Sequence, residues 1–108
     1  MTARPVIRRA LADRDIAGAV EFYLAEAGVS AAEGVIDAVE LAFRQISDFP
    51  ESGSARYAQE LLIPGLRSWT MAGYPWLVFY MAGEARTEVW RVLYAHRDIP
   101  AGMLEPDI

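Results

Sequence analysis

The sequence of 108 residues contains no cysteine and no lysine, and it has a single histidine. The absence of cysteine excludes disulfides, zinc–thiolate sites, iron–sulfur clusters and a cysteine nucleophile. Long apolar runs are also missing, because the best candidate, residues 76–82, is far shorter than the roughly 18 residues that a membrane span needs. The opening residues 1–5 lack the apolar stretch of a secretory signal. These absences predict a soluble, cytoplasmic protein.

The composition is typical of a folded domain. Hydrophobic residues make up 54% of the chain and charged residues 23%, a balance that disordered chains do not have. We therefore expect a single domain over residues 1–108. The formal net charge is −5: residues 1–53 carry nine acidic residues and five arginines, and residues 54–99 carry four acidic residues and five arginines. Because an acidic chain does not neutralise phosphates, we expect no direct binding of nucleic acid.

The first half of the chain has the spacing of two helices. Apolar residues recur at helical intervals over residues 12–27 and again over residues 32–46. Gly28 is a natural stop for the first helix, and only one further residue precedes the second. This pattern predicts an antiparallel helical hairpin over residues 12–50.

Polar residues near the predicted helix starts have the pattern of helix caps. Asp13 is expected to cap the first helix with its carboxylate. Ser30 and Glu33 have the spacing of a capping box for the second helix, which Pro50 would end.

The second half, residues 60–99, is rich in β-forming residues. Turn signals separate three runs, namely Leu66–Met71, Trp76–Met81 and Glu88–Tyr94. Val6 and Ile7 predict a further short strand at the start of the chain, and residues 100–108 form a tail. The fold class is therefore α+β in the order β-α-α-β-β-β, an antiparallel sheet with the helical hairpin packed on one face. Both sides of the last strand are largely apolar, so we expect the second face to meet another partner.

Few residues have the chemistry of a catalytic site. His96 is the single imidazole, and without a matched partner it is more often structural than catalytic. One histidine and scattered carboxylates also make a metal site improbable, so we expect neither metal nor cofactor. Arg67, Arg91 and Arg97 either converge on an anion at one end of the sheet or pair locally with acidic residues. The sequence leaves both alternatives open.

Aromatic residues are concentrated in the β-rich half. Three tryptophans and three tyrosines are involved: Trp69, Trp76, Trp90, Tyr74, Tyr80 and Tyr94. In a chain of this size most of them belong to the core, which leaves one or two for an interface.

Motifs along residues 4–99 resemble those of one known family. The motifs are Ala12-x-x-Asp15-Ile16, Tyr23, Pro50-x-x-Gly53, Pro64-Gly65-Leu66-Arg67-Ser68, Gly73-Tyr74, Val78-Phe79-Tyr80 and Val92-Leu93-Tyr94-Ala95-His96-Arg97-Asp98-Ile99. Their order and spacing resemble a ParE-type toxin of the RelE/ParE toxin-antitoxin superfamily. The resemblance implies a RelE/ParE-like fold and a toxin neutralised by a ParD-like antitoxin, with which it forms a hetero-oligomer.

The resemblance implies three alternatives for activity. Members similar to ParE inhibit DNA gyrase without catalysis, and this is the hypothesis that we favour. Relatives similar to RelE instead cleave mRNA on the ribosome, and here such a site would use Arg67, Arg91, Tyr94, His96 and Arg97. Met81 replaces a basic residue that is common after the Phe-Tyr pair, which speaks against the nuclease. A third alternative is a relative without toxicity that binds only its antitoxin.

An apolar sheet face edged by arginines suits an amphipathic, acidic antitoxin segment. The predicted antitoxin-binding residues are Arg67, Trp69, Trp76, Phe79, Trp90 and Arg91.

Overall fold

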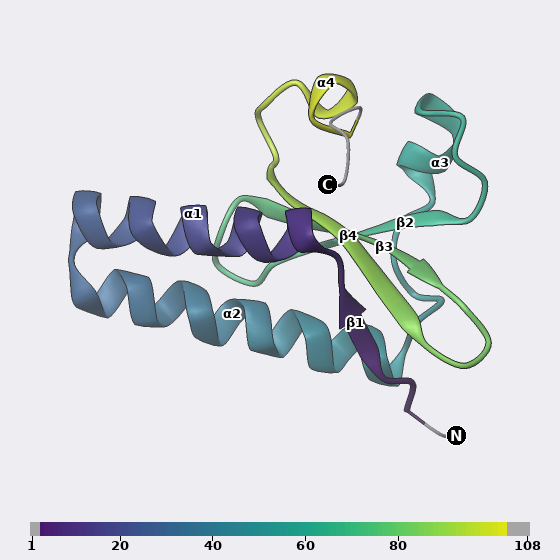
Figure 1. Ribbon diagram of the computed structural model, residues 1–108, viewed down its shortest axis with the longest axis horizontal. Coiled ribbons are helices and arrows are strands. Elements are labelled where there is room, and N and C mark those ends of the chain that lie inside the picture. Colours follow the sequence, from purple (N-terminus) through teal and green to yellow (C-terminus); the bar gives the residue numbers. More distant parts are fainter. Residues whose placement is uncertain (1–2, 104–108) are drawn as a thin grey trace.

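The computed structural model describes residues 3–103 and has a helical hairpin beside a four-stranded sheet (Figure 1). The elements in chain order are β1 (Val6–Arg8), α1 (Ala10–Ala27), α2 (Val29–Asp48), α3 (Arg56–Glu60), β2 (Leu66–Thr70), β3 (Trp76–Ala82), β4 (Thr87–Tyr94) and α4 (Ile99–Met103). The predicted α+β class and the predicted order of strands and long helices are confirmed. The short helix α3 was not predicted, and α4 lies mostly in the predicted tail. Residues 104–108 of that tail lie outside the described part of the chain.

The sheet has the strand order β1-β4-β3-β2. β2 and β4 both pair antiparallel with β3, as predicted. β1 pairs in parallel with β4 over Val6–Arg8 and Thr87–Val89, so the sheet is mixed and not wholly antiparallel. A long connection makes parallel pairing possible, because α1, α2, α3 and the β2–β3 hairpin all lie between β1 and β4 in the chain.

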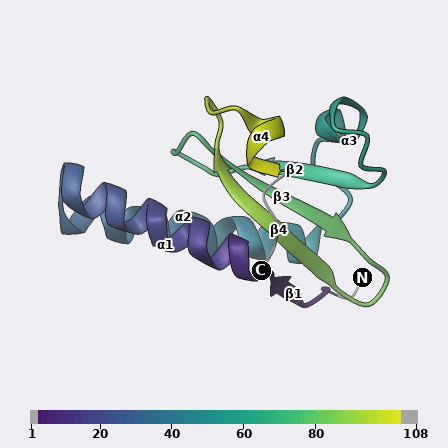
Figure 2. The same ribbon diagram turned by 45° about the horizontal axis from the view of Figure 1, so that its top comes forward.

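Helices cover both faces of the sheet, as Figure 2 shows. α1 and α2 pack on one face, and the core there includes Val35, Ile46, Val78 and Tyr80. The other face, with Leu66, Leu77, Phe79 and Leu93 at its centre, packs against Ile99 of α4 and against residues of and around α3, such as Tyr57. The chain's own short helices therefore cover much of the face that we expected to meet a partner.

The predicted caps are wrong, and the helices begin earlier than the polar signals suggested. α1 begins at Ala10, with Arg9 at the N-cap position, and the carboxylate of Asp13 instead forms an ion pair with Arg8 at 3.0 Å. α2 begins at Val29 without a side-chain cap, so Ser30 and Glu33 form no capping box. Gly28 does separate the two helices, and its φ of 92° favours glycine.

The joined ends of α1 and α2 extend beyond the sheet (Figure 1). Within residues 3–103, no helix is both long enough and apolar enough to cross a membrane.

Candidate partner-binding site

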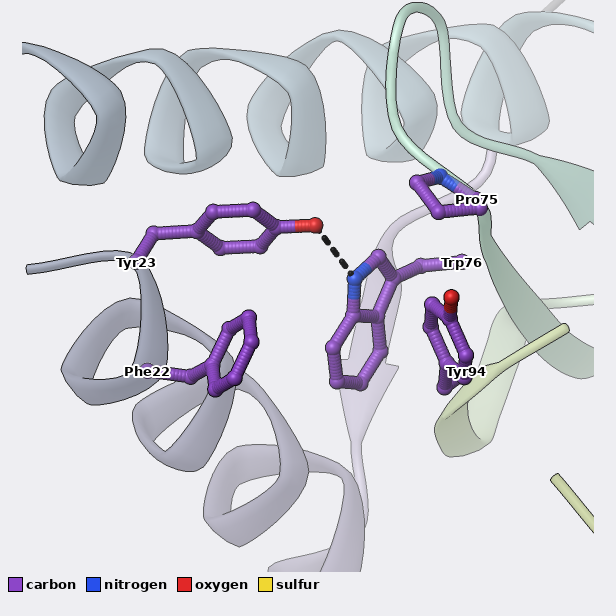
Figure 3. A pocket seen from close by; sticks show the side chains of 5 residues that line it. All are labelled: Phe22, Tyr23, Pro75, Trp76 and Tyr94. Atoms are coloured by element: carbon purple, nitrogen blue, oxygen red, sulfur yellow. Dashed lines mark hydrogen bonds between the residues drawn. The ribbon is translucent and has the colours of Figure 1, made fainter. Parts of the chain in front are cut away.

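An apolar pocket lies between α1 and the end of the sheet where β3 begins and β4 ends (Figure 3). Its volume is about 460 Å³, and it is lined by Phe22, Tyr23, Pro75, Trp76 and Tyr94. The side chain of Phe22 is 54% exposed and that of Tyr94 is 38% exposed. A pocket with four aromatic rings at its rim can accept an apolar side chain of a partner as an anchor. We call these five residues the aromatic pocket.

The rings of the aromatic pocket are fixed by contacts with one another. Trp76 Nε1 donates a hydrogen bond to the hydroxyl of Tyr23 at 3.0 Å, which ties β3 to α1. Tyr23 meets Phe22 and Tyr74 edge-on, at 5.3 and 5.2 Å between ring centroids, and Trp76 meets Tyr94 at 5.6 Å. Edge-to-face pairs of this kind are favourable. The pocket is therefore preformed.

Tyr74 supports the pocket from behind. Its hydroxyl donates to the carbonyl of Ala31 on α2 and lies so close to Gly34 that a Cβ there would clash with it. Gly34 therefore sits within α2, despite the usual cost of glycine in a helix, because the tyrosine needs the space.

Arg91 does not face a ligand but forms a buried ion pair. Its Nε and Nη2 donate to the two carboxylate oxygens of Asp15 on α1, at 2.7 and 2.8 Å. Its Nη1 donates to the carbonyl of Gly102 on α4. The side chain of Arg91 is only 5% exposed and its charge is matched by Asp15, so the guanidinium joins α1, β4 and α4.

Arg67 and Arg91 lie on opposite faces of the sheet. Arg67 pairs with Tyr80, which belongs to the core under the hairpin, whereas Arg91 pairs with Phe79, which belongs to the opposite core. Arg97 lies against Gly102 of α4, on the same side as Arg91. The three guanidiniums therefore do not converge on one anion. Arg91 pairs with Asp15 of α1, which is distant in the sequence, and not with a neighbouring carboxylate.

Arg67 has a local partner in the loop after α2. Its Nη1 donates to the carbonyl of Gly53 at 2.9 Å, and the N–H of Gly53 donates to the hydroxyl of Tyr80 at 3.0 Å. Burial raises the pKa of Tyr80, while the hydrogen bond from Gly53 and the nearby charge of Arg67 oppose the rise. A Cβ at Gly53 would collide with the ring of Tyr80, so this loop requires glycine.

Two of the predicted antitoxin-binding residues are unavailable to a partner. Phe79 is 0% exposed, with Tyr57 packed edge-on against it, and Arg91 is held by Asp15. Alternation along a strand places residues on faces but does not show which face is covered, so the sequence did not reveal that these two side chains are buried. Arg67, Trp69, Trp76 and Trp90 remain partly exposed.

The indoles of Trp69 and Trp90 have internal hydrogen bonds. Trp69 Nε1 donates to the side-chain oxygen of Gln45 on α2 at 3.0 Å. Trp90 Nε1 donates to Glu88 at 3.1 Å, and the guanidinium of Arg9 lies 4.1 Å from the centre of one of its rings. Arg9 also pairs with Glu88 at 2.7 Å. Both tryptophans thus have a structural role besides any contact with a partner.

Tyr94 and His96 lie side by side next to the aromatic pocket. Their ring centroids are 5.3 Å apart, and both side chains are exposed. The carboxylate of Asp98 accepts a hydrogen bond from the backbone N–H of Ala101. In residues 3–103, no group of three or more histidine, cysteine, aspartate or glutamate side chains could hold a metal ion.

Sequence reasoning missed three residues of the aromatic pocket, Phe22, Tyr23 and Pro75, as parts of one site. The sequence offered one signal for this site: Phe22 is a large apolar residue that lies outside the apolar face of the first helix, which indicates an exposed aromatic ring. Periodicity alone does not show that the end of β4 lies opposite it.

The fold is that of a small α+β domain with an apolar pocket between α1 and the sheet. Residues 6–99 match the family described as the ParE toxin of the type II toxin-antitoxin system parDE. Because the match spans most of the chain, the protein belongs to the ParE toxin family.

A solved structure described as the chromosomal ParDE TA system from P. aeruginosa has a similar fold. Its TM-score is 0.73 at 14% sequence identity, and the likeness covers 87% of this chain and 98% of that chain. At this identity the likeness shows the fold. No curated protein matches the sequence.

Proposed function

We propose that the protein inhibits DNA gyrase and that a ParD-like antitoxin neutralises it by binding over the aromatic pocket. Membership of the ParE family carries the proposal. The arrangement of charged groups supports it, because Arg91 is held by Asp15 and Arg67 lies on the other face of the sheet. The groups that an RNA-cleaving site would use are thus not gathered in one place. The toxin inhibits its target by binding to it, without catalysis, and forms a hetero-oligomer with the antitoxin.

The antitoxin anchors an apolar side chain in the aromatic pocket and contacts the partly exposed Arg67, Trp69 and Trp90 around the sheet. An antitoxin segment that extends over several of these sites typically folds only when it binds. Since gyrase acts on chromosomal DNA, the proposal places the toxin in the cytoplasm.

One observation keeps a ribonuclease as the second candidate. Tyr94 and His96 are adjacent and exposed, so they could act together on RNA. Arg97 is the one further exposed candidate near them along the chain. A toxin that cuts mRNA would depend on these residues.

Two assays with the pure toxin separate the candidates. The first follows supercoiling of relaxed plasmid by gyrase, and the second follows mRNA integrity in a translating ribosome extract. Loss of supercoiling with intact mRNA is the expected result. Cut mRNA with normal supercoiling contradicts the proposal, and the variants Tyr94→Phe and His96→Gln should then lose the cutting activity. If the toxin affects neither assay, it is a relative that binds only its antitoxin.

The antitoxin part is tested with the variant Phe22→Ser. Because Phe22 is half exposed and has one edge-to-face contact with Tyr23, its replacement should lower the free energy of unfolding by about 1 kcal/mol, which leaves the fold intact. Loss of an anchor in a pocket should weaken binding to the antitoxin encoded beside the toxin by about tenfold or more in calorimetry. Leu62→Ser is the matched control, because Leu62 is 86% exposed and lies in the loop before β2. Equal affinities of the two variants would show that the antitoxin binds elsewhere.

A further inference from the structure

The aromatic pocket has no lining residue from α2, yet one side chain connects it to that helix. The lining residues belong to α1, to β3 with Pro75 before it, and to β4. Tyr74, in the turn between β2 and β3, provides the connection, because its hydroxyl donates to the carbonyl of Ala31 in α2 at 3.4 Å. The ring of Tyr74 is partly buried and meets that of Tyr23 edge-on. Tyr74 therefore contacts α2 on one side and a pocket residue on another.

The position of Tyr74 against α2 requires glycine at residue 34. A Cβ at Gly34 would clash with the hydroxyl of Tyr74, whereas the ring carbon that carries this hydroxyl would be 3.6 Å away, at an ordinary contact distance. The hydroxyl cannot yield by itself, because its oxygen is held rigidly in the plane of the ring. A side chain at position 34 would therefore displace the whole ring of Tyr74.

A displaced Tyr74 ring would change the pocket through Tyr23. The ring centroid of Tyr23 lies 5.2 Å from that of Tyr74 and 5.3 Å from that of Phe22. The hydroxyl of Tyr23 accepts the hydrogen bond from Trp76 Nε1 at 3.0 Å (Figure 3). Closely packed side chains transmit a displacement to their neighbours, because little empty space separates them. Three of the five lining residues, Phe22, Tyr23 and Trp76, therefore depend on the position of Tyr74.

We propose that Tyr74, placed by Gly34, is a positioning residue of the aromatic pocket and sets its affinity for the antitoxin. The inference rests on the proposed function, which supplies the antitoxin as the occupant of the pocket. A preformed pocket binds its ligand more tightly than one that must rearrange, because fewer groups become ordered on binding. α2 thereby affects the binding of the antitoxin although it contributes no residue to the pocket lining.

Three variants test the positioning role with the antitoxin encoded beside the toxin. Gly34→Ala should weaken binding about tenfold in calorimetry, because the displaced ring changes the shape of an anchor pocket. Tyr74→Phe should weaken binding less than about threefold, since it loses one hydrogen bond but keeps the ring contact with Tyr23. The double variant G34A/Y74F is the matched control, because it keeps the alanine in α2 and removes the clashing hydroxyl. Its affinity should return to that of Tyr74→Phe.

A spectroscopic measurement reports the geometry of the pocket in the toxin alone. The indole N–H signal of Trp76 in the nitrogen–proton correlation spectrum can be assigned from its loss in Trp76→Phe. This signal should shift in Gly34→Ala and return toward its original position in the double variant. The indole signal of Trp90 is the internal reference, because its N–H is bonded to Glu88 and the side chain packs on the other face of the sheet. A general loss of structure would move both signals.

Three results would overturn the proposal. Unchanged affinity of Gly34→Ala would show that binding does not depend on the position of Tyr74. A loss of affinity without a shift of the Trp76 signal would show that the geometry of the pocket is not the cause. A loss that the double variant fails to restore would place the effect in α2 itself.

Failure of the proposed antitoxin site gives a different pattern. In that case Phe22→Ser also leaves the affinity for the antitoxin unchanged, while Gly34→Ala still shifts the Trp76 signal. The antitoxin then binds elsewhere, and the inference about its affinity fails together with the proposed site. If Phe22→Ser weakens binding and Gly34→Ala does not, the proposed site stands and the positioning role alone is wrong.

Discussion

On one face of the sheet lie α1 and α2, helices of 18 and 20 residues, and on the other lie α3 and α4, helices of five residues each. Both faces bury apolar side chains, but they do so with different kinds of cover. A long helix has many consecutive backbone hydrogen bonds and buries a continuous apolar face. A helix of five residues has few such bonds and is held mainly by the contacts of its side chains. The comparison teaches that one face should resist local opening and that the other should open more readily.

The largest loss of stability is expected on replacing Arg91, because this side chain joins α1 on one face of the sheet to α4 on the other. Arg91→Met leaves Asp15 buried without its partner and frees the carbonyl of Gly102, so we expect a loss of about 3–5 kcal/mol in the free energy of unfolding. Urea denaturation measures the loss. Arg56→Gln is the control, because water screens the exposed pair with Glu60 and its loss should change the stability little. Similar losses for both variants would rule out a special role of the buried pair.

A pair of core variants compares the two faces directly. Ile46→Ala under the hairpin should cost about 2–5 kcal/mol, because Ile46 is fully buried between long elements. Ile99→Ala should cost less, since α4 can move to fill the space or detach locally. Hydrogen exchange should then accelerate in α4 but not in α1 or α2. Global acceleration in the Ile99 variant would show that both covers belong to one cooperative unit.

A pH-dependent effect is expected at Tyr80. Because its pKa in the folded protein is raised, the folded state holds the phenolic proton more tightly than the unfolded state does. The resulting stabilisation is fully present below the ordinary tyrosine pKa of about 10 and is lost as the pH rises through the folded pKa. Stability measured between about pH 9 and pH 11 should fall less steeply in Tyr80→Phe than in the unmodified protein. Identical slopes would place the titration in other residues.

The smallest effect is an increase in stability at Gly18. This glycine lies inside α1, and an added Cβ would meet no atom within 4 Å. Gly18→Ala should therefore stabilise the protein by about 0.5–1 kcal/mol. Gly53→Ala is the contrasting variant and should destabilise the protein, because its Cβ would collide with Tyr80. Thermal unfolding of the two variants gives shifts of opposite sign if the packing is as described.

Much of the architecture could be predicted from the sequence, because helices and strands differ in the spacing of their apolar residues and in the length of the segments between turns. The hairpin was visible in the apolar spacing, and three strands were visible between turn signals such as Gly73. The parallel direction of β1 relative to β4 could not be predicted, because nearly eighty residues separate the two strands in the sequence. The caps were mispredicted at Asp13 and Ser30 because a polar signal a few residues into a helix does not show whether the helix begins before it.

The candidate site was harder to predict than the fold. Trp76 and Tyr94 were recognised as aromatic candidates, but the pocket exists only because Phe22 of α1 lies opposite them. Arg91 was recognised as a residue that needs a partner. Its partner, Asp15, is 76 residues away in the sequence, and only the tertiary structure shows the pair.

The carboxylate of Asp15 has one more contact, with the backbone N–H of Val92 at 2.9 Å. β3 pairs with one edge of β4 at Val92, and on the other edge β1 pairs only as far as Val89, so this N–H lies beyond the end of β1. An unprotected strand margin can recruit a matching strand from another molecule and begin aggregation. Because Asp15 accepts a hydrogen bond from this N–H, the donor is not available to a strand of another molecule. Asp15 therefore protects this edge of β4 from intermolecular pairing and also holds Arg91.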